Sequence, residues 1–219
     1  MLPDNLKLIV FDLDGTVADT LAPTFRCFQE AVKPVLGRKP TRREVLDRFG
    51  PADHRIIADW VGEDEAADAI ARLYDCYRRS YNDIEPFPGM VDLIRDLRKS
   101  GRKIALFTGR GRPSTDVVLR SMGLSSLFDF TVTGEEVPAH KPAPDGIHRI
   151  LDVLNTAREE TVFVGDTVSD LEAARGAGVH SVAALWDSPE PDRLVEKATI
   201  VATDVADLRN LLLGDSGSR

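Results

Sequence analysis

Two aspartates follow directly after an apolar run near the start of the chain. In the segment KLIVFDLDGTVADT, residues 7–20, Asp12 and Asp14 come after Leu8–Phe11 and before Gly15. Side chains two residues apart on an extended chain point the same way, so both carboxylates are predicted to face one site. Two such carboxylates repel each other, so either a cation lies between them or one keeps its proton. A simple turn could use the same residues, and the remaining sequence decides between these interpretations.

Further polar side chains follow other predicted strands. They are Thr108, Gly109 and Arg110 after the strand at 103–107, Lys141 in the loop after the strand at 130–133, and Asp166 and Asp170 after the strand at 161–164. Ligands of an open parallel sheet bind beyond the carboxyl ends of its strands. We therefore expect these groups to meet at one edge of a sheet.

These residue types suit phosphoryl transfer. Such a site must neutralise charge, supply a nucleophile and protonate the leaving group. Asp12 is the candidate nucleophile, which would form an aspartyl-phosphate, and Asp14 is the candidate acid and base. Thr108 and Lys141 are candidate phosphate ligands, because a hydroxyl and an ammonium both donate to phosphate oxygens. Asp12 and Asp166 offer the hard oxygen ligands that Mg²⁺ prefers.

The elements that position these groups form two patterns. From residue 86 onward, apolar strands alternate with helical stripes. The predicted strands are 103–107, 130–133, 161–164, 180–185 and 198–202, and the predicted helices are 90–100, 113–122, 144–154, 168–175 and 205–213. This alternation predicts an α/β fold, a parallel sheet with helices on both faces.

Residues 19–85 are different, because no convincing strand interrupts their helical periodicity. Thr41 and Glu44 match a capping box at the start of one short helix, and residues 66–81 carry an apolar stripe typical of a longer one. We interpret 19–85 as a helical cap inserted into a core made of 1–18 and 86–219.

Composition bounds the class of protein. The chain has 219 residues, a net charge of −8 and a sequence pI near 5.1, which argue against a general partner of nucleic acid or anionic membranes. It shows neither a signal peptide nor an apolar span, so a cytoplasmic monomer or homodimer is expected. Cys27 and Cys76 are expected to be reduced thiols, although their spacing does not exclude a disulfide.

Four segments together resemble the haloacid dehalogenase superfamily. They are DLDGT at 12–16, Thr108, Lys141 within HKPAPD, and GDTVSD at 165–170, in the family's order. The resemblance implies a Rossmann-like core with a helical cap between the first and second motifs. It also implies that Asp12 is the nucleophile and Asp14 the acid and base. Mg²⁺ would be held by Asp12, the main-chain carbonyl of Asp14, and Asp166, while Asp170 would order metal-bound waters or position Lys141.

The same resemblance implies an activity. It points to a Mg²⁺-dependent phosphatase of the phosphoglycolate phosphatase-like subgroup, acting on a small phosphorylated metabolite. Asp14 favours phosphatase over dehalogenase chemistry, because carbon–halogen cleavage needs no acid for the leaving group. A sugar-phosphate mutase, a pyrophosphatase or a nucleotidase on the same core stays open, as does a phospho-accepting or inactive binding module. Arg110 would contact substrate or be solvated, and His54 in the cap is a candidate specificity contact.

Overall fold

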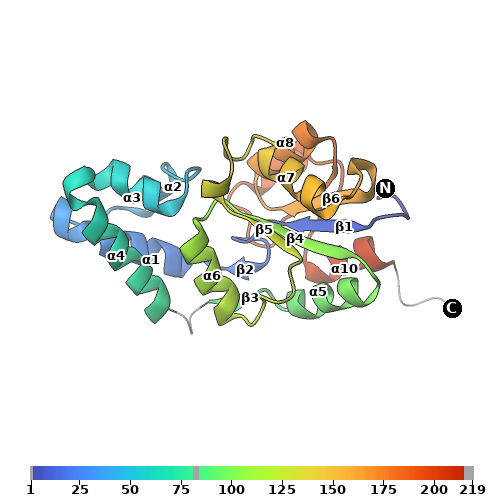
Figure 1. Ribbon diagram of the computed structural model, residues 1–219, viewed down its shortest axis with the longest axis horizontal. Helices are drawn as coiled ribbons and strands as arrows, with labels where there is room; N and C mark the ends of the chain where they lie inside the picture. The colour runs from blue at the N-terminus through green and yellow to red at the C-terminus, as the bar shows by residue number, and fades with distance from the viewer. Residues whose placement is uncertain (1, 81–83, 215–219) are drawn as a thin grey trace.

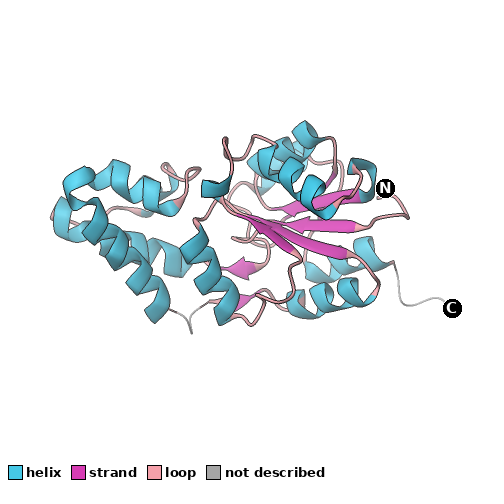
Figure 2. Cartoon of the chain, in the orientation of Figure 1, coloured by secondary structure: helices cyan, strands magenta, loops and turns pink. Residues whose placement is uncertain are grey.

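The computed structural model describes residues 2–80 and 84–214. A parallel sheet forms its centre, with the strand order β5-β4-β1-β6-β7-β8. The strands are β1 (Leu8–Phe11), β4 (Lys103–Phe107), β5 (Phe130–Val132), β6 (Thr161–Gly165), β7 (His180–Ala184) and β8 (Val201–Ala202). Figure 2 shows this sheet at the centre of the larger lobe, covered by helices. The predicted α/β class is confirmed.

Helices cover both faces of the sheet because the strands are apolar on both sides. The core helices are α5 (Met90–Lys99), α6 (Arg112–Ser121), α7 (Asp145–Leu154), α8 (Val168–Ala177), α9 (Pro191–Lys197) and α10 (Val205–Leu213). Along β1, Leu8 and Val10 pack in a cluster with residues of α7 and α8, whereas Ile9 and Phe11 pack in a second cluster with α5, α6 and α10. In Figure 1, α7 and α8 lie above the sheet and α5 and α10 below it.

The strand order places a switch in direction at β1. The chain passes from β1 to β4 and β5 on one side, then crosses to β6 on the other. Phe11 pairs with Leu106 of β4 and with Val164 of β6, so the three strands end at almost the same level. Loops diverge at such a point and leave a crevice beyond the strand ends. Three of the predicted site segments follow these strands, and the fourth, which contains Lys141, follows β5.

Four helices form a separate lobe, seen at the left of Figure 1. They are α1 (Leu21–Leu36), α2 (Arg42–Leu46), α3 (Asp53–Val61) and α4 (Glu63–Arg79), and they share an apolar cluster of their own. We call this lobe the cap. The Thr41–Glu44 capping box forms as predicted. The helix predicted over 66–81 begins earlier, at Glu63, and Tyr81 lies outside the described residues. No described helix is long and apolar enough to cross a membrane.

A short ladder joins the two connections between cap and core. β2 (Ala18–Asp19) and β3 (Glu85–Pro86) pair in antiparallel fashion, with Ala18 opposite Pro86. The sequence did not predict this ladder, because two residues are too few to show an alternating pattern. It also did not predict α9, which has a single buried apolar residue, Leu194.

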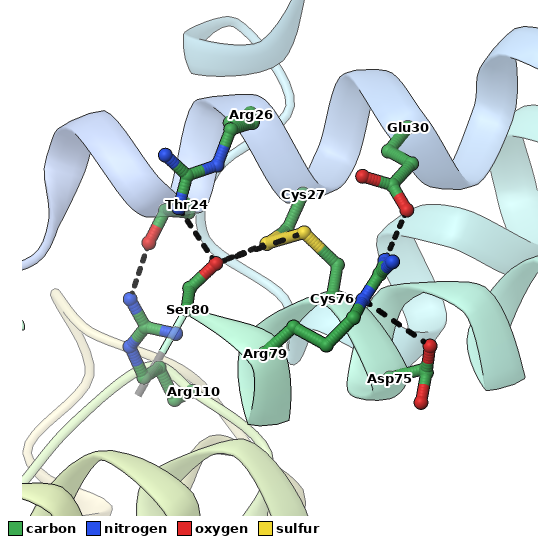
Figure 3. The surroundings of a disulfide bond; sticks show 9 residues. All are labelled: Thr24, Arg26, Cys27, Glu30, Asp75, Cys76, Arg79, Ser80 and Arg110. Carbon is green, nitrogen blue, oxygen red and sulfur yellow. Dashed lines mark hydrogen bonds and ion pairs between the residues drawn. A yellow bond between two sulfur atoms is a disulfide. The ribbon is translucent and has the colours of Figure 1, made fainter. Parts of the chain in front are cut away.

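A disulfide joins Cys27 of α1 to Cys76 of α4, so the expectation of two reduced thiols was wrong. The helices lie side by side and bring the two Cα atoms to 5.4 Å. Both cysteines are buried, and Ser80 lies against their sulfur atoms (Figure 3). The sequence does not reveal this pairing, because the two residues are 49 positions apart and meet only when the cap folds.

Removing the disulfide is expected to destabilise the protein. For a cross-link that closes a separation of 49 residues, the chain-entropy model gives a loss of about 4 kcal/mol in the free energy of unfolding. Urea unfolding of the wild type with and without a thiol reductant measures this loss. The double variant Cys27→Ala/Cys76→Ala serves as the control, because its stability should not respond to reductant. Equal stability of the oxidised and reduced wild type would contradict the prediction.

Candidate active site

Asp12 lies where β1 ends, and its side chain is buried. Its backbone N–H donates to the carbonyl of Val164 at 2.9 Å, which continues the parallel ladder and fixes the direction of the residue. Burial raises the pKa of Asp12 to about 7; Lys141 opposes this rise, and the charges of Asp170 and Asp14 add to it. A carboxyl held in this way is poised between its two protonation states near neutral pH.

Lys141 reaches the same place from the loop after β5. Its Nζ lies 2.6 Å from Asp12 and 2.7 Å from Asp170. Burial lowers the pKa of Lys141, but the two carboxylates outweigh burial and raise it overall. Asp170 is oriented by a capping box at the start of α8, in which its other oxygen accepts from the N–H and hydroxyl of Thr167. Local helix capping thus aims the carboxylate that holds Lys141.

Asp166 follows β6 and completes a group of buried carboxylates. Oxygen atoms of Asp12, Asp166 and Asp170 lie within 4.8 Å of one another. Burial and the charges of Asp12 and Asp170 raise the pKa of Asp166 well above its usual value, although Lys141 and the hydroxyl of Thr16 act in the opposite direction. This is the one such group found among the described residues.

Thr108 and Gly109 lie where β4 ends. The Thr108 side chain is fully buried, and its oxygen accepts from the backbone N–H of Arg110 at 3.2 Å. Its hydroxyl proton stays available for a phosphate oxygen. Both residues line a cavity of about 410 Å³ that also contains Asp12, Lys141 and Asp166 in its wall.

The Asp14 carboxylate lines the same cavity but has different partners. It pairs with Arg110, whose Nη2 lies 2.7 Å from Oδ1, and it accepts from the hydroxyl of Thr20. Burial lowers the pKa of Arg110, but Asp14 and Tyr77 outweigh burial and raise it overall. The sequence did not decide whether Arg110 contacts substrate or is solvated. One signal for a buried arginine was available, because Arg110 follows Thr108 by two residues and so lies at the sheet edge where the carboxylates gather.

The site segments of the sequence therefore converge at the carboxyl ends of β1, β4 and β6, on a sheet with an inserted helical cap. Residues 9–184 match the family of haloacid dehalogenase-like hydrolases. The chain belongs to this family. It is accordingly a hydrolase, and the resemblance seen in its sequence motifs is confirmed.

Named relatives are similar over most of the chain. It is 28% identical to phosphoglycolate phosphatase 1 of Pseudomonas aeruginosa, a match that covers 94% of this chain and 78% of the relative. It is 26% identical to pyrophosphatase PpaX of Bacillus mycoides, covering 88% and 94%. The structure of CbbY from Rhodobacter sphaeroides, in complex with phosphate, matches with a TM-score of 0.81 at 24% identity, covering 93% and 96%. This last likeness shows the fold.

Gly15 allows Asp166 to approach the first loop. Its φ is +75°, and a Cβ added there would lie 2.3 Å from Oδ2 of Asp166. Gly37 at the end of α1 has a similar φ of +69° with nothing within 4 Å. Both glycines adopt the left-handed backbone conformation, but of the two only Gly15 lies against Asp166.

We expect Gly15→Ala to destabilise the protein more than Gly37→Ala does. Each variant loses about 1–2 kcal/mol of unfolding free energy from the left-handed backbone, and Gly15→Ala loses about 1–3 kcal/mol more because it crowds Asp166. Urea unfolding of the two variants measures the difference. Equal losses of unfolding free energy in the two variants would show that the Asp166 side chain moves aside without cost, and this would contradict the prediction.

Proposed function

We propose that this protein is a Mg²⁺-dependent phosphatase that hydrolyses a small phosphorylated metabolite through an aspartyl-phosphate on Asp12. The observation that carries the proposal is the contact of Lys141 with Asp12 in a cavity whose wall also includes Thr108 and Asp166. The proposed nucleophile Asp12, the ammonium of Lys141 and the hydroxyl of Thr108 thus line the same cavity. These are the groups that attack phosphorus and neutralise a bound phosphate.

The donor set fits Mg²⁺. Three buried carboxylates lie within 4.8 Å of one another, and among the described residues Lys141 is the one ammonium that contacts them, at Asp12 and Asp170. The group therefore carries excess negative charge when it is ionised. Hard oxygen ligands in this number are what Mg²⁺ takes, with waters and phosphate completing its shell. Asp12, Asp166 and the main-chain carbonyl of Asp14 would hold the ion. When bound, it supplies positive charge that offsets the charge of the phosphate.

The side chains divide the reaction between them. An oxygen of Asp12 forms a bond to phosphorus, the bond to the leaving oxygen breaks, and Asp14 gives that oxygen a proton. In the second half, Asp14 takes a proton from water as the water oxygen bonds to phosphorus and the bond to Asp12 breaks. Inorganic phosphate leaves, Asp12 is again a carboxylate and Asp14 is again protonated. Lys141 and Thr108 hold phosphate oxygens in both halves.

The cap side of the cavity favours an organic leaving group. Its apolar part is formed by the cap residues Leu21, Phe28, Leu46, Phe49 and Ile56, and the buried carboxylate of Asp53 lines the same side. The named relatives include a phosphoglycolate phosphatase and a pyrophosphatase. A second phosphate would set a dense charge against this apolar wall at a large desolvation cost. We therefore propose an organic phosphate monoester, with pyrophosphate as the second candidate to assay beside it.

Asp12→Asn is expected to abolish hydrolysis of p-nitrophenyl phosphate in the presence of Mg²⁺, because the amide cannot form the phospho-enzyme. Asp14→Asn is expected to slow steady-state turnover by about 10²- to 10⁴-fold. It should still release a burst of one p-nitrophenolate per site, because this leaving group needs no proton and only the second half lacks its base. Rapid-quench and steady-state assays measure both phases.

Mg²⁺ titration provides the control for these variants. Asp14→Asn should keep its Mg²⁺ affinity, because the main-chain carbonyl stays in place. Absence of turnover in the pure wild type, or full turnover in Asp12→Asn, would rule out the proposed reaction. A loss of Mg²⁺ affinity alone in Asp14→Asn would rule out its role in proton transfer.

Mg²⁺ binding is expected to weaken as the pH falls. The pKa of Asp12 is raised to about 7, so below that pH the ion must displace a proton from it. The apparent Kd for Mg²⁺ should rise by at least about tenfold for each pH unit below the pKa of Asp12, because a proton on Asp12, and another where Asp166 is also protonated, competes with the ion. Calorimetric titration across this range measures the slope. A Kd that does not change with pH would show that Asp12 is already ionised without the metal.

A further inference from the structure

Arg110 holds both oxygens of the Asp14 carboxylate. Its Nε lies 2.8 Å from Oδ1 and 2.9 Å from Oδ2, and its Nη2 lies 2.7 Å from Oδ1. Contacts of a planar guanidinium with both oxygens fix the plane of a carboxylate as well as its distance. The direction in which Asp14 presents its oxygens is therefore set by Arg110, with the hydroxyl of Thr20 as a second contact.

The cap holds the other side of Arg110. Nη2 also donates to the hydroxyl of Thr24 in α1 at 2.5 Å, as Figure 3 shows, and the guanidinium carbon lies 5.2 Å from the ring centre of Tyr77 in α4. Cys27 lies one helical turn after Thr24, and Cys76 directly precedes Tyr77. The disulfide thus joins α1 and α4 next to the two residues that contact Arg110.

Stability alone does not account for an arginine at this position. Arg110 is only 7% exposed, and its Nη1 has no hydrogen-bond partner among the described residues. A buried cation with incomplete partners pays a large desolvation cost, and apolar replacements of buried ion pairs are often neutral or stabilising. Arg110 also lines the cavity that contains Asp12 and Asp14. Because burial of Arg110 is costly and its side chain lines the cavity of the candidate active site, we infer that it has a role in the reaction.

We propose that Arg110 is a positioning residue for Asp14 and that it transmits docking of the cap to this carboxylate. The proposal rests on the proposed function, because proton transfer by Asp14 is part of it. With the cap docked, Thr24 and Tyr77 hold the guanidinium, and the guanidinium holds Asp14 in one orientation. Without Arg110 the carboxylate keeps only its contact with the Thr20 hydroxyl, which does not fix its plane. Misplacement of a reacting group by 1 Å lowers a rate by about 10²-fold.

Variants of Arg110 test this role against a neighbouring arginine. Arg112 lies two residues further on, at the start of α6, but pairs with Glu136, so Arg112→Ala is the matched control. On p-nitrophenyl phosphate, Arg110→Ala should lower kcat by about 10²-fold with KM changed less than about threefold. Arg110→Lys should recover part of kcat, since an ammonium cannot match both oxygens as a guanidinium does. Arg112→Ala should keep kcat within about twofold.

A double-mutant cycle with Asp14→Asn separates positioning from a structural role. In the Asp14→Asn background, Arg110→Ala should change kcat by less than about twofold, because there is no carboxylate left to orient. The p-nitrophenolate burst counts competent sites, so a partly folded variant does not distort the comparison. A further fall of about 10²-fold in that background would overturn the proposal, because Arg110 would then act through something other than Asp14.

Thr24→Val tests the link to the cap, because valine keeps the shape of threonine but cannot accept from Arg110. It should lower kcat by about three- to tenfold, and it should have no further effect once Arg110 is alanine. An unchanged kcat, or a full additional loss in the Arg110→Ala background, would overturn the coupling to the cap. If Asp12→Asn keeps full turnover, the proposed function itself fails, and this result is distinct from either outcome of the cycle.

Discussion

The active site depends on one buried ammonium shared by two carboxylates. Lys141 contacts Asp12 and Asp170, and Asp166 lies within the same 4.8 Å group. Burial removes water from these oxygens, so each carboxylate is costly to ionise beside the others. The pKa of Asp12 and that of Asp166 stay raised even with Lys141 in place. The single ammonium therefore leaves the group short of positive charge, and this shortage is the physical basis of the proposed divalent cation at Asp12 and Asp166.

Backbone architecture brings these charges together. β1 lies between β4 and β6, so residues that follow three separate strands meet at one edge. The capping box of α8 aims Asp170 at Lys141, and Gly15 lets Asp166 lie close to the first loop. Each carboxylate also has a fixed hydrogen-bonding partner, which offsets part of the repulsion among them. These partners are Lys141 for Asp12, Thr16 for Asp166 and Thr167 for Asp170.

The cap contributes an apolar wall and a hold on Arg110. Its helices pack around their own apolar cluster, and the Cys27–Cys76 disulfide joins the two longest of them. Thr24 and Tyr77 project from these helices to Arg110, which in turn contacts Asp14. A change in the packing of α1 against α4 would move Thr24 and Tyr77 and so disturb the contacts of the Arg110 guanidinium. The disulfide restricts such a change.

From the sequence we predicted the α/β core, a helical insertion after the first strand, and the meeting of Asp12, Thr108, Lys141 and Asp166, which the structure places around one cavity. These follow from local signals: apolar periodicity, capping boxes and polar side chains at predicted strand ends. The disulfide between Cys27 and Cys76 and the pairing of Arg110 with Asp14 appear only in the folded structure, because these residues lie 49 and 96 positions apart in the chain. No local pattern encodes such contacts, because they exist only after helix packing and loop closure bring distant segments together.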